Sequence, residues 1–207
     1  SHDLFLYNRD KPRLVGLDQE FISSPKLDDL MSTYSALLGF LETKIDDAVV
    51  IPLYAAFDNE EVGSLTRQGA NSTFLKDTLT RITRNLNADY EASIASSFLL
   101  SIDNAHADHP NHPEYTDKTT KIELNKGVVI KYNANQSYTS DAYSSAIVKS
   151  LLKDLNLNYQ EFTNRSDLRG GSTLGNLSNS EVSLISCDIG LPQLAMHSAN
   201  ELAGSHD

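Results

Sequence analysis

The feature that most constrains the fold of this chain is the alternation of helix-like and strand-like apolar patterns along its length. Amphipathic helices are predicted by apolar residues at three- and four-residue spacing, in segments 29–44, 71–86 and 140–157. Short apolar runs without that spacing predict strands buried on both faces, at 48–57, 93–103, 127–135 and 182–188. Alternating strands and helices predict an α/β fold, with a central mixed sheet flanked by helices.

Each predicted helix has one apolar face that we expect to pack against the sheet. These faces are Leu30, Tyr34, Leu37, Leu38 and Leu41 in the first helix, Phe74, Leu75, Leu79, Ile82 and Leu86 in the second, and Tyr143, Ile147, Leu151 and Leu155 in the third. Pro52 argues against the first strand, because proline cannot donate to a strand ladder.

Composition excludes several classes of partner. The chain has 207 residues, of which 28 are acidic and 17 basic, and a formal net charge of -11. This charge argues against nucleic acid and against an anionic membrane surface, which both bind Lys and Arg. The single cysteine, Cys187, is expected in the core and excludes an intramolecular disulfide, so we expect a reducing, cytoplasmic compartment. No apolar run is long enough to span a membrane, and residues 1–13 lack a signal-peptide pattern.

Acidic residues follow three of the predicted strands, at Asp58 to Glu61, at Asp103 and at Asp188. In open α/β sheets, ligands bind at the carboxyl ends of strands. Asp28, just before the first helix, and His197, after the last strand, complete a set of carboxylates with a histidine. Such sets bind zinc, manganese or cobalt in hydrolases.

The residues alone leave plainer roles open for each candidate. Asp28 could cap a helix, Glu60 and Glu61 could be a solvated pair, Asp103 could form a turn, and His197 could be structural. The polar loop 103–126, with three histidines, is long enough to be functional, and the glycine-rich stretch 169–175 offers exposed backbone to a ligand.

The order of the motifs resembles the aspartyl aminopeptidase / aminopeptidase I family of zinc metallopeptidases. The resemblance runs over about residues 18–204. It rests on the stretches EFISSPKLDDL, DNEEVGS, SIDNAHADHPN, GVVIKYNANQSYTSD, GGSTLG and DIGLPQLAMHSANE.

The resemblance implies an aminopeptidase with two neighbouring divalent metal ions, usually zinc. Asp28 would bridge both ions, Glu61 and His197 would complete one site, and Asp103 would help to hold the other. Glu60 would be the general base that takes a proton from the metal-activated water. Adjacent residues of an extended segment point to opposite sides, so one strand end could supply both a ligand and a base.

The same resemblance implies a peptide-binding cleft. His106 matches a family histidine near the substrate, and Gly171 and Ser172 belong to a loop that lines the cleft. Acid-preferring relatives have a lysine within NANQ, where this chain has Ala134 and Asn135. Lys131 is the nearby alternative, either as a substrate-binding cation or as a solvated strand-end residue. We therefore expect neutral or apolar first residues to be preferred over Asp and Glu.

The chain departs from the family pattern in ways that affect the expected function. It lacks the His-Thr-Asp-Ser-Pro-like motif that supplies a further metal-binding histidine, so the site with Asp103 would lack one ligand. We expect residues 1–17 to be the end of an inserted dimerisation domain and residues 18–207 to be the C-terminal part of an incomplete catalytic domain. In the cleft loop, Gly170 and Asn176 replace a cysteine and a proline of many relatives.

Relatives form dimers that build a dodecamer, which implies a homo-oligomer for the full-length protein. The alternative function is a catalytically incompetent fragment or scaffold module of the same fold. A related di-metal carboxypeptidase or deacylase fits the order of motifs less well.

Overall fold

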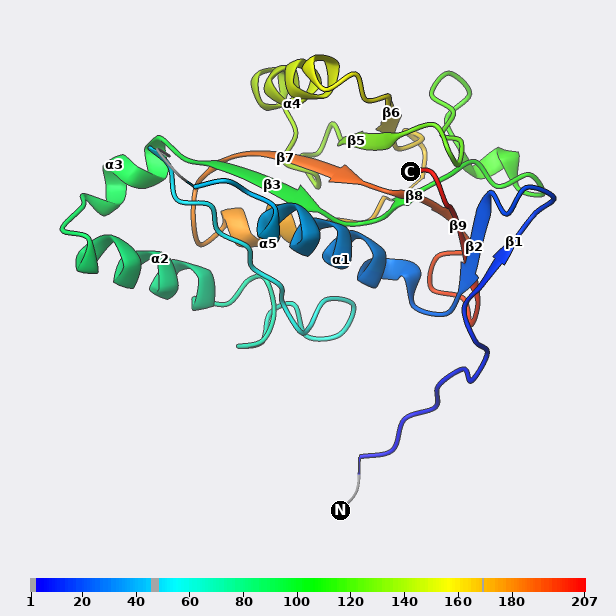
Figure 1. Ribbon diagram of the computed structural model, residues 1–207, viewed down its shortest axis with the longest axis horizontal. Coiled ribbons are helices and arrows are strands. Elements are labelled where there is room, and N and C mark those ends of the chain that lie inside the picture. The colour runs from blue at the N-terminus through cyan, green and yellow to red at the C-terminus, as the bar shows by residue number, and fades with distance from the viewer. Residues whose placement is uncertain (1–2, 46–48, 169) are drawn as a thin grey trace.

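The computed structural model describes residues 3–45, 49–168 and 170–207 (Figure 1). Within these residues, the strands form a four-stranded and a five-stranded sheet. No helix in the described ranges is both long enough and apolar enough to cross a lipid bilayer.

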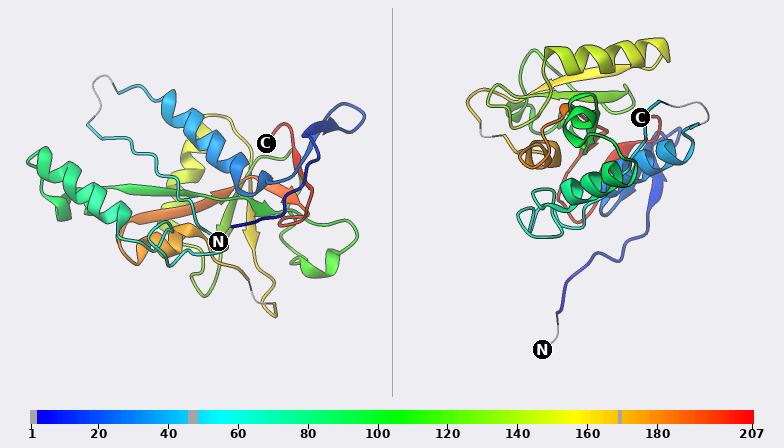
Figure 2. Two further views of the ribbon diagram at one scale, coloured as in Figure 1. Left: turned by 90° about the horizontal axis from the view of Figure 1, so that it is seen from below. Right: turned by 90° about the vertical axis from the view of Figure 1, so that its left-hand side faces the viewer.

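The four-stranded sheet confirms the expected mixed α/β core. It contains, in spatial order, β3 (Phe98–Ile102), β7 (Ile185–Gly190), β5 (Val128–Tyr132) and β6 (Tyr159–Thr163). The pairs β3–β7 and β5–β6 are parallel, whereas β5 and β7 are antiparallel. Helix α4 (Ala142–Asp154) lies on one side of this sheet, and α1 (Leu27–Leu41) and α5 (Leu174–Asn179) lie on the other (Figures 1 and 2).

The central strand β5 is apolar at successive positions because both of its faces are buried. Val129 and Ile130 point to opposite faces and are both fully buried. Val129 packs with Tyr138 and Phe162, and Ile130 packs with Val148 and Cys187 under α4. Cys187 is thus a free, buried core residue, as its apolar surroundings in the sequence predict.

The five-stranded sheet continues from the first. Its order is β1 (Arg13–Val15), β2 (Phe21–Ser24), β9 (Glu201–Gly204), β8 (Pro192–Leu194) and β4 (Ala105–His106). The parallel pair β3–β7 runs on into the parallel pair β4–β8. Asp103 lies at this transition, where its N–H donates to the Ile189 carbonyl at 3.1 Å.

The remaining described helices are α2 (Phe74–Asn85), α3 (Tyr90–Ala95) and a 3₁₀ turn at Pro113–Tyr115. Side-chain caps fix two helix starts, since Asp89 accepts from the Ala92 N–H, and Asp141 and Ser144 form a capping box on α4. The expected strand at 93–103 starts too early. Residues 93–95 belong to helix α3, and strand β3 begins only at Phe98. Ser93, Ser96 and Ser97 leave no continuous apolar run before Phe98.

The expected strand at 48–57 is wrong for the residues that the structure describes there. Residues 49–57 have no strand assignment, and residue 48 lies outside the described ranges. Pro52 has no N–H to donate, and Val49, Val50 and Ile51 are exposed rather than buried. An apolar run becomes a strand only where a neighbouring strand accepts its hydrogen bonds, and β3 pairs only with β7 among the described residues.

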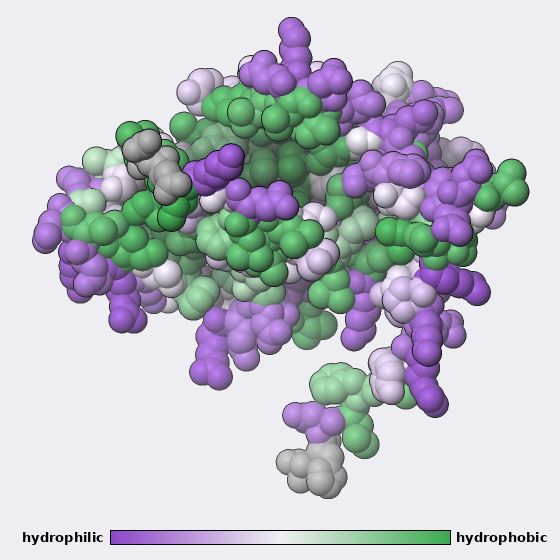
Figure 3. Space-filling view, viewed as in Figure 1, coloured by the Kyte–Doolittle hydropathy of each residue, from purple (hydrophilic) through white to green (hydrophobic). Residues whose placement is uncertain are grey.

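The predicted inward faces of two helices are also largely wrong. On α1, Leu30, Tyr34 and Leu41 are exposed, while Leu27 and Ser32 are buried. Hydrophobic side chains accordingly lie on the surface over α1 (Figure 3). On α4 the predicted stripe of Tyr143, Leu151 and Leu155 is exposed, and Ser144, Ser145 and Val148 face the sheet instead. Two small serines and a valine therefore form the buried face of α4, which contacts β7.

This assignment of the α4 faces predicts opposite results for two substitutions. Ser145→Leu inserts a large side chain at a position that is 3% exposed, so we expect it to lower the free energy of unfolding by about 1–3 kcal/mol. Leu151→Ser changes a residue that is 57% exposed, and should alter that free energy by no more than about 0.5 kcal/mol. Urea unfolding followed by circular dichroism measures both, and a larger loss for Leu151→Ser would contradict the assignment.

Candidate metal centre

The antiparallel pair β2–β9 brings Asp28 and His197 together. Ser24, the last residue of β2, lies opposite Glu201, the first residue of β9. Because the strands are antiparallel, the chain that leaves β2 and the chain that enters β9 meet at one edge of the sheet. Asp28 and His197 are each four positions from these strand ends, so both side chains reach the same point.

Glu60 and Glu61 come from a compact loop between residues 58 and 71. The N–H groups of Asp58 and Asn59 donate to the Gln68 carbonyl, and the Asn71 N–H donates to the Ser64 carbonyl. The backbone of Gly69 approaches Ser64 so closely that a Cβ at Gly69 would lie 2.2 Å from its carbonyl oxygen. The sharp turn holds the two glutamates beside the ends of β2 and β3.

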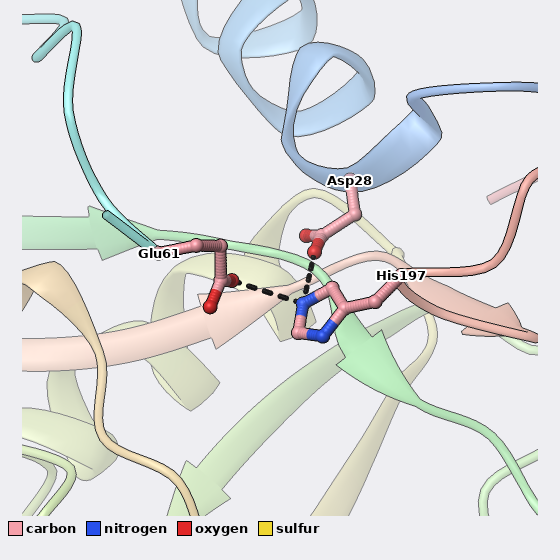
Figure 4. Close-up of side chains that lie close together, drawn as sticks. All are labelled: Asp28, Glu61 and His197. Atoms are coloured by element: carbon pink, nitrogen blue, oxygen red, sulfur yellow. Dashed lines mark ion pairs between the residues drawn. The ribbon is translucent and has the colours of Figure 1, made fainter. Parts of the chain in front are cut away.

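Three side chains converge at this point (Figure 4). The Nε2 atom of His197 lies 2.9 Å from Asp28 Oδ2 and 2.9 Å from Glu61 Oε1. Asp28 is almost buried, with 9% of its side chain exposed, whereas the side chains of His197 and Glu61 are mostly exposed to solvent.

The donor atoms fit a divalent metal ion. A ring nitrogen carries at most one hydrogen, yet Nε2 faces two carboxylate oxygens at equal distance. The three donor atoms lie within 4.8 Å of one another, so one ion could contact all of them. One nitrogen with two carboxylates is a donor set that zinc accepts.

A second group of donors adjoins the first and includes Asp103. Carboxylate oxygens of Asp28, Asp29 and Asp103 also lie within 4.8 Å of one another. Asp29 Oδ1 is buried and has no hydrogen-bond partner among the described residues, an unfavourable state unless a cation lies nearby. Asp28 belongs to both groups, as a bridging ligand would.

The crowded carboxylates repel one another and resist ionisation without a cation. Burial, and next the charge of Asp103, raise the pKa of Asp28 to about 6 and that of Asp29 to about 8. The same two causes raise the pKa of Glu60 to about 7. A bound cation would reverse this effect by favouring the charged forms.

The site opens into a cleft of about 720 Å³. The expected base and all four expected substrate-binding residues line this cleft, namely Glu60, His106, Lys131, Gly171 and Ser172. The walls of the cleft desolvate the His106 ring, and the charge of Lys131 acts with them to lower the pKa of His106.

Lys131 is not the solvated strand-end residue that the sequence left open. It is 3% exposed, and its Nζ donates to Asp103 Oδ2 at 3.2 Å and to the Asn104 carbonyl at 2.6 Å. Its ammonium also lies 5.6 Å from the centre of the Tyr138 ring. Lys131 thus lines the cleft with its charge already paired to an expected metal ligand.

Asp188, the third acid expected at a strand end, lies inside β7 and apart from the donor groups. It is fully buried and accepts hydrogen bonds from Ser101, Thr173 and both the N–H and hydroxyl of Thr139. These contacts tie β7 to β3 and to two loops. Four donors satisfy this carboxylate without a metal ion.

Sequence reasoning missed two residues of the site, Asp29 and Glu201. Asp29 adjoins Asp28 in the stretch KLDDL, where two acids in succession were the available signal. Glu201 ends the stretch HSANE and is 3% exposed, and its carboxylate accepts the backbone N–H groups of both Asp28 and His197. Nothing in local sequence pattern shows that a glutamate at the start of a strand faces inward.

An α/β sheet with carboxylates and a histidine gathered where its strands end has a donor set suited to a divalent metal ion. Comparison with known proteins identifies the family to which the chain belongs. The family model described as "Aminopeptidase I zinc metalloprotease (M18)" matches residues 1–207. The chain belongs to this family, as the resemblance of its motifs predicts.

Relatives and solved structures agree with this assignment. The chain is 47% identical to the "Probable M18 family aminopeptidase 2" of Clostridium novyi (strain NT), over 99% of this chain and 48% of the relative. The protein of the same description from Ectopseudomonas mendocina (strain ymp) is 38% identical, over 100% of this chain and 47% of the relative. The chain spans about half the length of these relatives.

Among solved structures, yeast aminopeptidase 1 superimposes with a TM-score of 0.87 and 27% identity, over 97% of this chain and 47% of that chain. The M18 aminopeptidase of Thermotoga maritima superimposes with a TM-score of 0.82 and 26% identity, over 96% of this chain and 46% of that one. These matches confirm the predicted fold class.

Removing the one nitrogen donor should weaken metal binding. We expect His197→Ala to retain less zinc than the unsubstituted chain after dialysis, because two carboxylates alone hold zinc poorly. His206→Ala, at an exposed histidine outside the site, is the matched control. Elemental analysis measures the zinc content, and equal content in both variants would exclude His197 as a ligand.

The raised carboxyl pKa values predict how pH affects the metal-free chain. Between about pH 6.5 and pH 8.5, the folded Glu60 and Asp29 release protons that the unfolded chain has already lost at lower pH, so stability should fall as pH rises through this window. The lowered pKa of His106 acts in the opposite direction, at the lower end of this window and below it.

Urea unfolding at both ends of the pH window, with chelator and with zinc, tests this expectation. Zinc should reduce the fall in stability, and Glu60→Gln should reduce it in the metal-free chain. A metal-free chain that is equally stable or more stable at the higher pH would show that the acids are not crowded as described.

Proposed function

We propose that the full-length protein containing this chain is a metal-dependent aminopeptidase that releases N-terminal residues from peptides. The observation that carries this proposal is the convergence of Asp28, Glu61 and His197 beside Glu60 at the base of one cleft. Membership of the M18 family supports the same activity. The single buried thiol supports a reducing compartment, and we propose the cytoplasm.

Two ions fit the two overlapping donor groups. Asp28, Glu61 and His197 would hold one, and Asp28 with Asp103 would hold the other, with Asp29 close enough to add its free oxygen. The bound ions would polarise the scissile carbonyl and lower the pKa of water. Lys131 would fix the orientation of Asp103 by pairing with the carboxylate oxygen Oδ2.

Glu60 is the residue placed to move protons. It faces the cleft, yet it belongs to neither group of candidate ligands. Without a cation its pKa is about 7, and bound cations would lower this pKa, so Glu60 would be an ionised base near neutral pH. Glu60 would take a proton from the attacking water and deliver it to the nitrogen of the leaving amine.

The charges in the cleft favour neutral first residues of the substrate. Among the described residues that line the cleft, the cations are Lys131 and Arg165, and each is paired with an acid. Arg165 binds Asp167 at 2.7 Å, and Lys131 binds Asp103. An acidic side chain would have to compete with both carboxylates, whereas the free amino group of a peptide would be attracted by the acids around the metal centre.

A catalytically incompetent or scaffold role for this chain remains the alternative proposal. It is favoured by the incomplete donor group around Asp103, which contains no histidine among the described residues. Assembly is a separate proposal: a solved relative is described as the mApe1 dodecamer, with a TM-score of 0.86 and 27% identity, and we propose a homo-oligomer for the full-length protein.

Replacing the proposed base should separate catalysis from metal binding. In the full-length protein, Glu60→Gln should keep its zinc and lose about two orders of magnitude or more in kcat, because the amide cannot accept the proton. Steady-state assays with zinc analysis of the same samples measure both. Full activity would remove Glu60 from this role, and loss of zinc would make it a ligand.

The cleft charges also predict substrate preference. The full-length protein should have a higher kcat/KM for a leucyl substrate than for an aspartyl substrate with the same leaving group. A clear preference for the aspartyl substrate would show that a cation outside the described part of the chain, or Lys131 released from Asp103, binds the acidic side chain.

A further inference from the structure

One carboxylate connects two of the candidate metal ligands through their backbones. Glu201 begins β9, and its Oε1 accepts the His197 N–H at 2.8 Å while its Oε2 accepts the Asp28 N–H at 2.9 Å. The side chain is 3% exposed, so solvent does not compete for either hydrogen bond. Asp28 and His197 lie far apart in sequence, and the Glu201 carboxylate holds both.

Both ligands lie on irregular backbone that would otherwise be poorly fixed. Asp28 has φ -85° and ψ 116°, outside helical values although α1 has begun, and the preceding Lys26 has φ 61°. His197 has φ 65°, in the left-handed region that a residue with a Cβ rarely adopts. Neither segment lies within the ladder of β2 and β9, because the pair formed by Ser24 and Glu201 is the last one at this end.

We propose that Glu201 is a positioning residue of the metal centre. By accepting both N–H groups, it sets the distance between the Cα atoms of Asp28 and His197 and so places their side chains for joint contact with one ion. Glu201 does not itself contact the ion, because both of its oxygens already accept backbone hydrogens and it belongs to neither donor group. The inference rests on the proposed metal site and adds a residue that determines its geometry.

Two substitutions of Glu201 distinguish the effect of its hydrogen-bonding position on metal binding from the effect of its negative charge. Glu201→Gln removes the negative charge and replaces one acceptor oxygen with an NH₂ group, which leaves one N–H unpaired. Glu201→Asp keeps the charge but is one methylene shorter and cannot reach both N–H groups. If Glu201 acts by position, both variants weaken metal binding. If it acts only by its charge, Glu201→Asp binds like the unsubstituted chain.

Asp188→Asn is the matched control for general loosening of the fold. Asp188 is an equally buried carboxylate with four hydrogen-bond donors, but its partners are Ser101, Thr139 and Thr173 rather than the candidate ligands. It should destabilise the metal-free chain as Glu201→Gln does, and leave the metal centre unchanged.

The experiment measures the zinc dissociation constant of each chain by competition with a chromophoric chelator, and the visible absorption spectrum of each chain with saturating cobalt(II). We expect both Glu201 variants to bind zinc about 10–100-fold more weakly and to shift the cobalt bands, as for lost partners of metal ligands. Asp188→Asn should stay within about threefold and keep the unsubstituted spectrum.

Unchanged affinity and spectrum in Glu201→Asp, or an equal loss in Asp188→Asn, would overturn the inference. If Glu201→Gln does not fold, Glu201→Asp still decides between position and charge. An unsubstituted chain without zinc affinity would instead refute the proposed metal site, so the two failures are distinguishable.

Discussion

The antiparallel pairing of β2 with β9 is the contact on which the candidate site depends. It places the end of one strand beside the start of the other, and each of these two ends leads within four residues to a candidate metal ligand. A shift of this register by one residue would turn Glu201 to the opposite face of the sheet and separate Asp28 from His197. The alignment of two four-residue strands thereby determines whether a metal centre can form.

A second constraint is the point where the parallel pair β3–β7 passes from one sheet into the other. Asp103 lies at that transition, beside the buried ammonium of Lys131. Carboxylates from three separate parts of the chain thus meet in a small, partly buried volume. Their mutual repulsion and burial raise their pKa values, which is unfavourable for the protein alone and favourable for a cation. A bound cation would therefore stabilise the crowded carboxylates.

The sequence predicted where helices and strands lie better than which of their faces are buried or which strands they pair with. Helices at 29–44, 71–86 and 140–157 and the core strand around Val129 follow from periodicity and apolar content. The inward face of α4 did not follow, because Ser144 and Ser145 pack against the sheet by being small rather than apolar. The segment 49–57 has strand-like composition, but strand formation depends on a partner that no local pattern specifies.

The sequence likewise predicted only part of the candidate site. The motifs placed Asp28, Glu61, Asp103 and His197 as expected ligands, and the structure brings all four into two adjoining groups. Asp29 and Glu201 were missed because their roles arise from tertiary contacts: an orphaned buried oxygen in one case, and two backbone N–H groups from distant segments in the other. Motifs identify side chains that touch a metal, whereas the residues that hold those side chains in place become visible only in three dimensions.

Diffraction at the zinc absorption edge, from crystals of the full-length protein, tests the central claim most directly. The account predicts an anomalous peak about 2.0–2.2 Å from donor atoms of Asp28, Glu61 and His197, and a second peak that contacts Asp28 and Asp103. Zinc bound elsewhere, with His197 still hydrogen-bonded between the two carboxylates, would contradict it.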